Sequence, residues 1–418
     1  MTNKINSTFI QIIHPVCCGL DVHKDRISAC LISIGKEGEE IHELREFETF
    51  TESLYEMKNW LIANNCPVVA MESTGVYWRP VHNVLEASMT VYLVNARHIK
   101  NVPGRKTDLS DSKWLAGLLR HGLLKGSFIP PDNIREVREL TRLIKTYTET
   151  TADYKRRIHK LFITANIKID SVVSDLFGKT GRNLINILCT KTDITIEDIK
   201  ENASGSLKSK VKELHVSIQG FFKDHHRFQL IGMMDTIAIL EEQIKQINQR
   251  VNKLTQEHED LLNRLDAIPG IDKKSAQAII GEIGITLEEF ACVAAFVSWA
   301  GLCPGNNESA GKRKSGRSPV RNHPLKTLLI QVAWAAIKTK DSYYKAKYYK
   351  LKVKRGAKKA IVAIAHRIGK AIYSIVKNGD TYRDLGEAFL TGSEKERAIY
   401  NLKKKADALG YNVVPCNA

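Results

Sequence analysis

The chain has 418 residues, with 63 Lys and Arg against 46 Asp and Glu, so its formal charge is +17 and its pI is about 9.4. This length exceeds one ordinary hydrophobic core, and the positive charge indicates a polyanionic partner. No apolar run reaches the ~18 residues of a membrane helix, the N-terminus lacks a signal-peptide pattern, and the eight cysteines show no disulfide or zinc-site spacing. We therefore expect a soluble cytoplasmic protein with more than one domain.

The N-terminal region has the pattern of an α/β domain. After a tail over residues 1–14, two β-rich runs in residues 16–34 flank a polar turn and predict a hairpin. Further strands are predicted over residues 45–50, 67–73 and 89–96, and helices over residues 51–64 and 81–87. Strands mixed with helices indicate one α/β sheet domain over residues 15–128.

Four carboxylates stand out in this region. Asp21 and Glu72 each end an apolar strand, where an unpaired charge is costly. Asp108 and Asp111 share a face in the first turn of a helix that Thr107 is expected to cap. A cluster of these acids would need a cation, and oxygen ligands at this density suit Mg²⁺. Taken singly, each acid is also explained as a surface residue or, at the helix start, as a partner of the helix dipole.

The region from residue 129 to residue 264 reads as helical. Residues 134–168 predict one long helix with many Lys and Arg, which phosphate contacts and a solvated helix face explain equally well. Residues 237–268 carry apolar side chains at alternating spacings of three and four. That spacing predicts a long coiled-coil linker whose seam pairs protomers or folds back on another helix.

The C-terminal region, residues 265–378, is predicted to be mainly α-helical and is followed by a tail over residues 379–418. Residues 265–284 predict two helices joined by a Pro-Gly turn, which is typical of a helix-hairpin-helix. Such hairpins bind a DNA phosphate without reading sequence. Lys273 and Lys274 are the expected ligands, and a plain helical hairpin is the alternative.

A glycine-rich basic loop over residues 300–324 carries one serine of interest, Ser309. Glycines let the backbone approach a ligand closely and clustered cations favour phosphate, so we expect this serine to lie against a nucleic-acid backbone. The alternative is a solvated loop with an idle serine. Residues 312–370 contain 18 Lys and Arg but one acid, Asp341, which makes the basic field local. The expected nucleic-acid ligands of this region are Lys312, Arg313, Lys314, Arg317, Arg321, Arg355, Lys358 and Lys359.

Several motifs resemble one family, the insertion-sequence-110 type DEDD transposases, which are related to the pilin-gene invertases. Its DEDD domain has an RNase H-like fold similar to that of the RuvC junction resolvase. The N-terminal matches are Gly19-Leu20-Asp21-Val22-His23-Lys24, Glu72-Ser73-Thr74-Gly75 and Lys106-Thr107-Asp108-x-x-Asp111. The C-terminal matches are Ile268-Pro269-Gly270-Ile271, Ala300-Gly301-Leu302-x-Pro304, Gly311-Lys312-Arg313-Lys314-Ser315-Gly316 and Arg355-Gly356-x-Lys358-Lys359-Ala360.

The resemblance implies a transposase or site-specific recombinase that excises and inserts an insertion sequence under guidance by a bridge RNA. In the family, the serine five residues after the lead-in proline is the nucleophile, and here that residue is Ser309. It implies a covalent 5′-phosphoserine link to DNA, assisted by Mg²⁺ on the four acids. Two departures concern this loop: the chain has Ser309-Ala310-Gly311 where the family has Ser-Gly, and it lacks the Lys-Gly-Asn segment. Ser315 is the alternative nucleophile.

The resemblance also implies partners and surroundings. These are donor and target DNA, the bridge RNA, a bacterial cytoplasm with the nucleoid, and a homo-oligomer in which dimers assemble to a tetramer. The acids of one protomer would then meet Ser309 of another. Two other functions stay open: a RuvC-like metal-dependent junction nuclease, which needs the acids but not Ser309, and a non-catalytic nucleic-acid-binding regulator, which needs neither.

Overall fold

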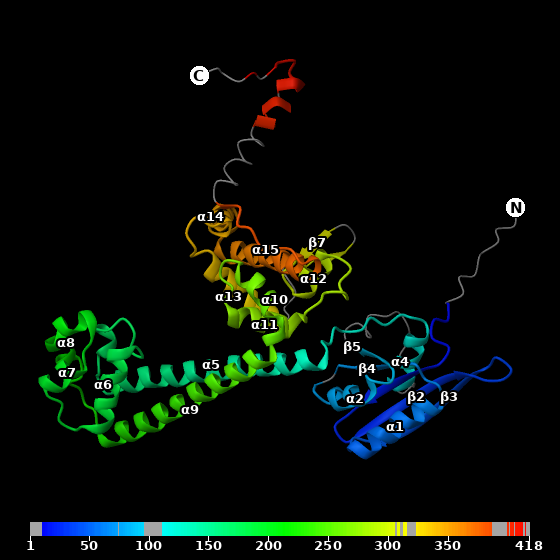
Figure 1. The fold of residues 1–418 in the computed structure, drawn as a ribbon, viewed down its shortest axis with the longest axis horizontal. Coiled ribbons are helices and arrows are strands. Elements are labelled where there is room, and N and C mark those ends of the chain that lie inside the picture. Colours follow the sequence, from blue (N-terminus) through cyan, green and yellow to red (C-terminus); the bar gives the residue numbers. More distant parts are fainter. Residues whose placement is uncertain are drawn as a thin grey trace. The chain divides into compact units, whose positions relative to one another are not determined.

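The computed structural model describes residues 11–73, 75–95, 111–305, 307–309, 312–315 and 323–386, with short parts of residues 399–414. The chain forms two compact units, Met1–Ile129 and Pro130–Ala418 (Figure 1). The division follows Ile129, next to the domain boundary predicted after residue 128. Among the described residues, no helix has the length and apolar character needed to cross a bilayer.

The N-terminal unit is built on a five-stranded sheet with the order β3-β2-β1-β4-β5. β2 pairs antiparallel with β1 and β3, whereas β4 pairs parallel with β1 and β5. The strands are β1 (Cys17–Val22), β2 (Arg26–Ile34), β3 (Glu40–Glu48), β4 (Val68–Glu72) and β5 (Thr90–Val94). The predicted hairpin is confirmed, and the third strand begins at Glu40 rather than at residue 45 because its whole length pairs with β2.

Helices cover both faces of this sheet. α1 (Thr51–Ala63) and α2 (Trp78–Leu85) pack against the face that includes Leu20. α4 (Asp111–Arg120) covers the opposite face, which includes Cys17. Strands buried on both faces are apolar at consecutive positions, which is why β1 begins with an uninterrupted apolar run. The sheet order and the two helical layers are consistent with an RNase H-like fold.

The second unit contains a long helical hairpin, which we call the stem. α5 (Asp132–Thr164) and α9 (Asp224–Leu254) lie side by side along it (Figure 1). An ion pair of 2.7 Å between Arg250 Nη2 and Glu136 Oε1 joins the last turns of α9 to the first turns of α5, so the helices run antiparallel. The long helix predicted over residues 134–168 is therefore confirmed within a few residues.

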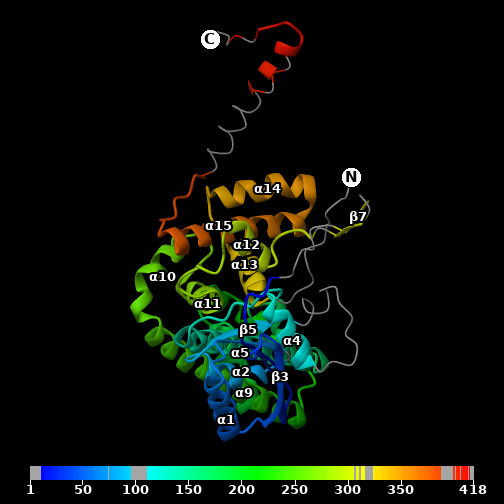
Figure 2. The same ribbon diagram turned by 90° about the vertical axis from the view of Figure 1, so that its right-hand side faces the viewer.

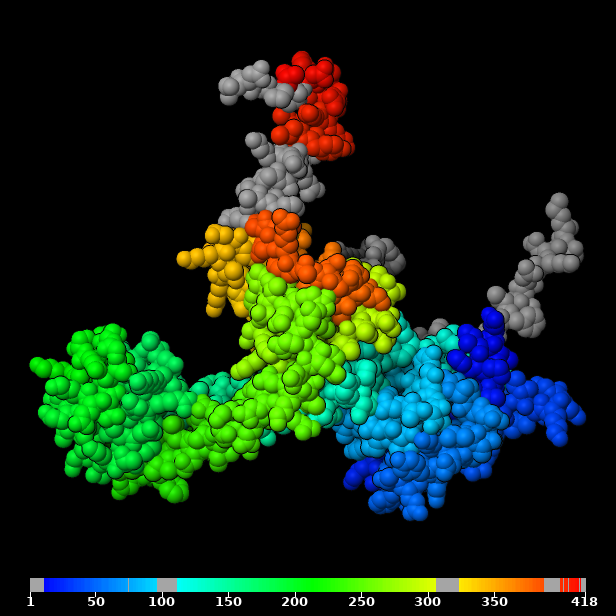
Figure 3. All heavy atoms as spheres, in the orientation of Figure 1, coloured from blue at the N-terminus to red at the C-terminus, as the bar shows by residue number. Residues whose placement is uncertain are grey.

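A small helical cluster, which we call the tip, lies between the two stem helices in the sequence. It has its own apolar core, to which both stem helices contribute. In the space-filling view, the stem is thinner than the tip that it carries (Figure 3). The tip contains η1 (Ile169–Ser171), α6 (Lys179–Thr190), α7 (Ile196–Asn202), η2 (Gly205–Lys210) and α8 (Val211–Ser217).

The coiled-coil seam predicted over residues 237–268 does not form one continuous helix. α9 ends at Leu254, and the chain continues through the short turn η3 (Gln256–His258) into α10 (Glu259–Asp266). The reason is that the later seam residues, such as Leu265, belong to the core of the C-terminal helices. The earlier seam residues do fold back on another helix, α5.

The C-terminal body packs its helices around one large apolar core. Residues 306–322, expected to be a loop, contain two short antiparallel strands, β6 (Asn307–Ser309) and β7 (Lys312–Ser315). The helices of the body are α10, α11 (Lys273–Ile283), α12 (Val293–Trp299), α13 (Pro324–Ala336), α14 (Tyr343–Arg355) and α15 (Ala357–Asn378).

A buried carboxylate joins this body to the stem. Glu282 of α11 is 4% exposed and accepts two hydrogen bonds from the guanidinium of Arg142 on α5, at 2.7 and 2.8 Å. Arg138, one turn earlier on α5, donates to the backbone carbonyls of Gly281 and Glu282 at 2.9 and 2.8 Å. From the sequence, the cations of this helix could bind phosphate or lie on a solvated face. Arg138 and Arg142 instead hold α5 to α11.

Candidate functional site

Two of the four predicted acids are aligned at the ends of neighbouring strands. β1 and β4 pair in parallel with Leu20 opposite Met71, and the same register places Asp21 beside Glu72. Side chains alternate along a strand, so both carboxylates fall on the face that α4 covers, two residues beyond Gly19 and Ala70. The sheet itself therefore brings these two acids together.

α4 runs antiparallel to β1 and carries a third acid toward them. The Arg120 guanidinium donates to the Pro15 carbonyl at 3.1 Å, and a Cβ on Gly19 would lie 2.1 Å from the Ser112 carbonyl oxygen. Residue 120, at the end of the helix, therefore lies near residue 15, and residue 112, near its start, lies near residue 19. Asp111, the first residue of α4, continues this path toward Asp21. Only glycine permits so close an approach of strand and helix.

The donor set fits Mg²⁺ by its chemistry. Asp21, Glu72 and Asp111 offer only carboxylate oxygens, the ligands that this ion prefers. Within the described part of the chain, no three His, Cys, Asp or Glu side chains are grouped closely enough to hold a metal ion. The fourth predicted ligand, Asp108, lies outside the described residues. The structure therefore aligns Asp21 with Glu72 but does not bring Asp111 into a three-ligand group with them.

His23 is a neighbour of the site that the sequence analysis quoted but did not assign. Its Nε2 lies 3.2 Å from Asp21 Oδ2, and its side chain is exposed. The turn after β1 fixes it there, because the His23 N–H donates to the Arg26 carbonyl at 2.9 Å. The signal was its spacing of two from Asp21, which places both side chains on one face of an extended chain. This contact orients the Asp21 carboxylate.

The predicted nucleophile ends the first strand of the basic hairpin. Ser309 is in cross-strand register with Lys312, and Glu308 with Arg313. The backbone therefore places Ser309 next to a predicted phosphate ligand, whereas Ser315 lies at the other end of the hairpin, opposite Asn307. Arg317 and Arg321 lie outside the described residues.

The predicted helix-hairpin-helix has two helices and a turn, but its turn packs inward. A Cβ on Gly270 would lie 2.4 Å from the Val332 carbonyl oxygen of α13. Lys273 is held by Glu259, with its Nζ at 2.7 and 2.8 Å from the two carboxylate oxygens. Lys274 is exposed. Phosphate binding by this hairpin stays a prediction.

The remaining predicted ligands surround the joint between α14 and α15. Arg355, Lys358 and Lys359 are all exposed there. Gly356, with a φ of +76°, makes the joint in the left-handed region that favours glycine. The sharp turn therefore presents three cations on one corner of the body.

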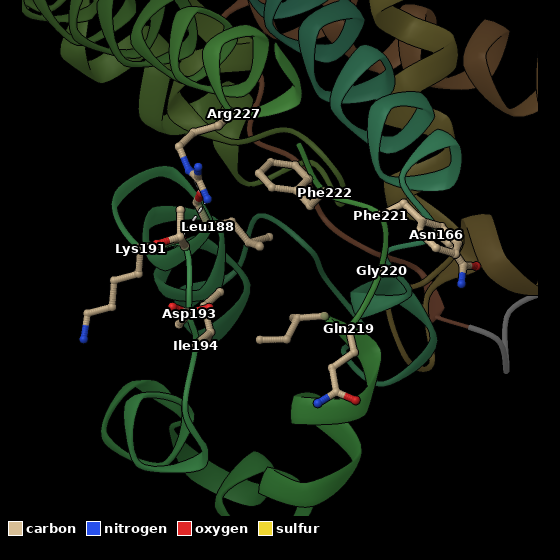
Figure 4. A pocket seen from close by; sticks show the side chains of 12 residues that line it. Asn166, Leu188, Lys191, Asp193, Ile194, Gln219, Gly220, Phe221, Phe222 and Arg227 are labelled. Carbon is tan, nitrogen blue, oxygen red and sulfur yellow. Dashed lines mark hydrogen bonds between the residues drawn. The ribbon is translucent and has the colours of Figure 1, made fainter. Parts of the chain in front are cut away.

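A pocket in the tip was not anticipated from the sequence. It has a volume of about 530 Å³ and contains none of the predicted site residues (Figure 4). Arg227 lies at one side, where its guanidinium donates to the backbone carbonyls of Leu188 and Lys191, each at 2.9 Å. These hydrogen bonds hold the Arg227 guanidinium at the C-terminal end of α6.

Comparison with protein families identifies both regions that carry the predicted site. Residues 18–166 match a family model of the DEDD IS110 type, described as a transposase. Residues 262–350 match a model described as a transposase of the IS116/IS110/IS902 family. The first match contains the four acids and the second contains Ser309 with its basic hairpin. No curated protein matches the chain.

Proposed function

This chain belongs to the IS116/IS110/IS902 family of transposases and acts in DNA recombination, and from that premise we propose that it uses Ser309 as its nucleophile. Asp21, Glu72, Asp108 and Asp111 would hold Mg²⁺. The observation that carries the proposal is the alignment of Asp21 with Glu72 on the face that α4 covers. A bound cation would offset the repulsion between two carboxylates that are held side by side.

The chemistry at the serine is an exchange of phosphate esters. The Oγ of Ser309 loses its proton and attacks the phosphorus, a Ser–O–P bond forms, and the bond to the 3′ oxygen breaks. That oxygen gains a proton and leaves as a 3′-OH. A 3′-OH then attacks the phosphoserine, which restores the DNA backbone and frees the serine. One ester bond forms for each that breaks, so no ATP is consumed.

A serine hydroxyl is a weak nucleophile unless it is activated. Lys312 and Arg313 follow Ser309 in the hairpin and would offset the negative charge that develops on the phosphate. Bound by the four acids, Mg²⁺ would supply Lewis-acid polarisation of the phosphate oxygens. His23 would keep the Asp21 carboxylate oriented for that role.

We further propose that a bridge RNA guides the choice of donor and target DNA, and that the active form is a homo-oligomer, with dimers assembling to a tetramer. The support is the family resemblance together with the exposed cations of the second unit, such as Arg355, Lys358 and Lys359. In such an assembly, the acids of one protomer meet Ser309 of another. An active purified monomer would contradict this arrangement.

A denaturing gel tests the serine mechanism. The protein with its co-expressed RNA and Mg²⁺ is mixed with end-labelled, nicked donor DNA. We expect a slow protein–DNA band for the wild type and for the control Ser315→Ala, and none for Ser309→Ala or Asp21→Asn. A band that survives Ser309→Ala but disappears with Ser315→Ala would move the nucleophile to Ser315.

The second candidate function is a metal-dependent junction nuclease. The observation that favours it is that Asp21 and Glu72, two of the acids that hydrolysis would need, are aligned at the ends of neighbouring strands. The same gel separates the two. Free cleaved DNA without a slow band, unchanged by Ser309→Ala and lost with Asp21→Asn, would establish the nuclease and overturn the serine mechanism.

A further inference from the structure

Helix α14 carries a dense row of cations on the surface of the C-terminal body. Its sequence contains six Lys and Arg and no acid. It lies along α15 (Figure 2). Tyr344 and Tyr348, each 3% exposed, anchor it through one face to the apolar core. The Ser342 side chain caps its first turn and is held in turn by Asp384. The helix is therefore fixed in place by its inner face and its first turn.

The outer face of α14 has an apolar ridge between two rows of lysine. At about 100° per residue, Ala346, Tyr349 and Val353 fall on the side opposite the buried tyrosines. Tyr349 is 53% exposed and Val353 is 89% exposed. The lysines that flank the ridge are Lys345 and Lys352 on one side and Lys347, Lys350 and Lys354 on the other.

Lys345, Lys352 and Lys354 differ from the cations of the stem. Arg138 and Arg142 of α5 are engaged by the backbone and carboxylate of α11. In the described part of the chain, Lys345 and Lys354 form no ion pair, and Lys352 lies 5.8 Å from the ring of Tyr349. A row of cations without internal acids is electrostatically suited to an external polyanion.

The ridge indicates which polyanion fits. Lysines alone would bind any phosphate chain, but an exposed apolar ridge between them matches a groove that has phosphates on both rims and base edges on its floor. The major groove of B-form DNA is about 12 Å wide and admits an α-helix of about 10–12 Å diameter. The major groove of an A-form RNA duplex is too narrow for side chains to read.

We propose that α14 enters the major groove of duplex DNA, with Tyr349 and Val353 against the base edges and the flanking lysines against the two phosphate backbones. Apolar side chains in this groove contact the thymine methyl group, so the helix adds a preference for certain bases that does not depend on a guide RNA. The proposal goes beyond the serine mechanism and requires neither Ser309 nor the metal.

Fluorescence anisotropy with the full-length protein tests it. Binding of a short duplex DNA and of an RNA duplex of the same sequence is measured over about 50–200 mM salt. For Lys345→Ala with Lys352→Ala, we expect the slope of log K against log salt on DNA to shrink by about 1.8, which is about 0.9 per lost phosphate contact. The matched control is Lys208→Ala with Lys210→Ala, which changes two exposed lysines of η2 in the tip and should leave the slope unchanged.

The ridge is tested separately with Val353→Asp and Tyr349→Ala. Both side chains are exposed, so the fold is kept. Each variant should weaken DNA binding by at least about fivefold, the size of one lost base contact, and should leave RNA-duplex binding within about twofold. Val353→Asp binding DNA as tightly as the wild type would overturn groove entry, as would equal losses on DNA and RNA.

Two further outcomes separate this proposal from a membrane-surface role of α14 and from the serine mechanism. Binding to anionic lipid vesicles that is lost in the ridge variants, with DNA binding unchanged, would make α14 a membrane-surface helix and overturn the proposal. A missing covalent band on the denaturing gel, with the ridge effect on DNA intact, would contradict the serine mechanism and leave the groove-binding helix standing.

Discussion

The two units of the molecule place their charges by different means. Residues 1–129 contain 14 Lys and Arg against 14 Asp and Glu, whereas residues 130–418 contain 49 against 32, so the whole excess of +17 belongs to the second unit. In the first unit, the acids of interest are fixed by strand register and by the contact of α4 with Gly19. In the second, cations lie on exposed helices and on a two-stranded hairpin.

This difference matches what each kind of group must do. Carboxylates that share a cation must be held close together against their repulsion, and a hydrogen-bonded sheet covered on both faces supplies that rigidity. Cations that follow a phosphate backbone need reach and spacing rather than close contact. We therefore expect DNA cleavage, which needs the acids of the first unit, to respond to metal and to packing changes. DNA binding by the second unit should respond to salt.

Removal of metal should separate the two units most strongly, because it should abolish cleavage and leave DNA binding in place. With EDTA, we expect DNA cleavage and covalent attachment to fall to background, because the acids then have no cation to share. Binding of duplex DNA, measured by anisotropy at constant ionic strength, should stay within about twofold, since the phosphate contacts proposed for the second unit need no metal. Cleavage that persists in EDTA would break the assignment of the acids to a metal.

Within the second unit, loss of Glu282 should have the largest effect on stability. Glu282→Ala leaves the Arg142 guanidinium without its carboxylate acceptor and removes the charge that lies 4.0 Å from Arg138 Nε, while the backbone carbonyls that Arg138 contacts remain. We expect the free energy of unfolding in urea to fall by about 3 kcal/mol, the lower end for a broken buried pair, because the Arg142 side chain is 41% exposed. The matched control is Arg250→Ala, which removes an exposed pair with Glu136 and should cost at most about 1 kcal/mol.

In the first unit, a single methyl group on Gly19 should disturb the acids. Gly19→Ala places a Cβ 2.1 Å from the Ser112 carbonyl oxygen, so α4 must move away from β1. We expect a loss of about 1–3 kcal/mol in unfolding free energy and a larger fractional loss of cleavage, since Asp111 moves with the helix. Gly117→Ala is the control, because nothing lies within 4 Å of its Cβ. It should be neutral or slightly stabilising.

The smallest expected effect is a pH-dependent one at the contact between the tip and the stem. Hydrogen bonds from Arg182 lower the pKa of Glu241, so this contact stabilises the fold above the ordinary Glu pKa of about 4.3 and is lost as the pH falls through the lower, folded value. Glu241→Gln should cost less than about 1 kcal/mol at neutral pH, because both side chains are about a third exposed. The difference in unfolding free energy between Glu241→Gln and the wild type should vanish as the pH falls below about 4.3. The neighbouring Glu242→Gln should show no such gap.

The sequence predicted best what local patterns control. Apolar runs located β1 and β4 and predicted that each ends at an acid, whereas the parallel pairing that aligns the two acids came only from the structure. The motif spacing also identified the family of both matching regions.

Features that depend on distant contacts were missed. The apolar spacing of residues 237–268 is the same for a continuous seam as for a helix that breaks at Leu254, and only the C-terminal core decides between them. The role of Glu282 could not be read from its neighbours, because its partners are about 140 positions away. The pairing of Ser309 with Lys312 was hidden by the glycine and basic residues, which read as a loop.

The stem has a consequence for how such a chain can change over generations. The tip leaves the stem just after Thr164 and returns just before Asp224, and the two ends are joined by a hydrogen bond of 2.7 Å from the Phe221 N–H to the Ala165 carbonyl. A segment whose ends meet can be exchanged or shortened at little cost in loop closure. The cost of replacing the tip therefore lies less in closing the chain than in packing against the stem residues that complete its core, such as Phe162 and Leu230.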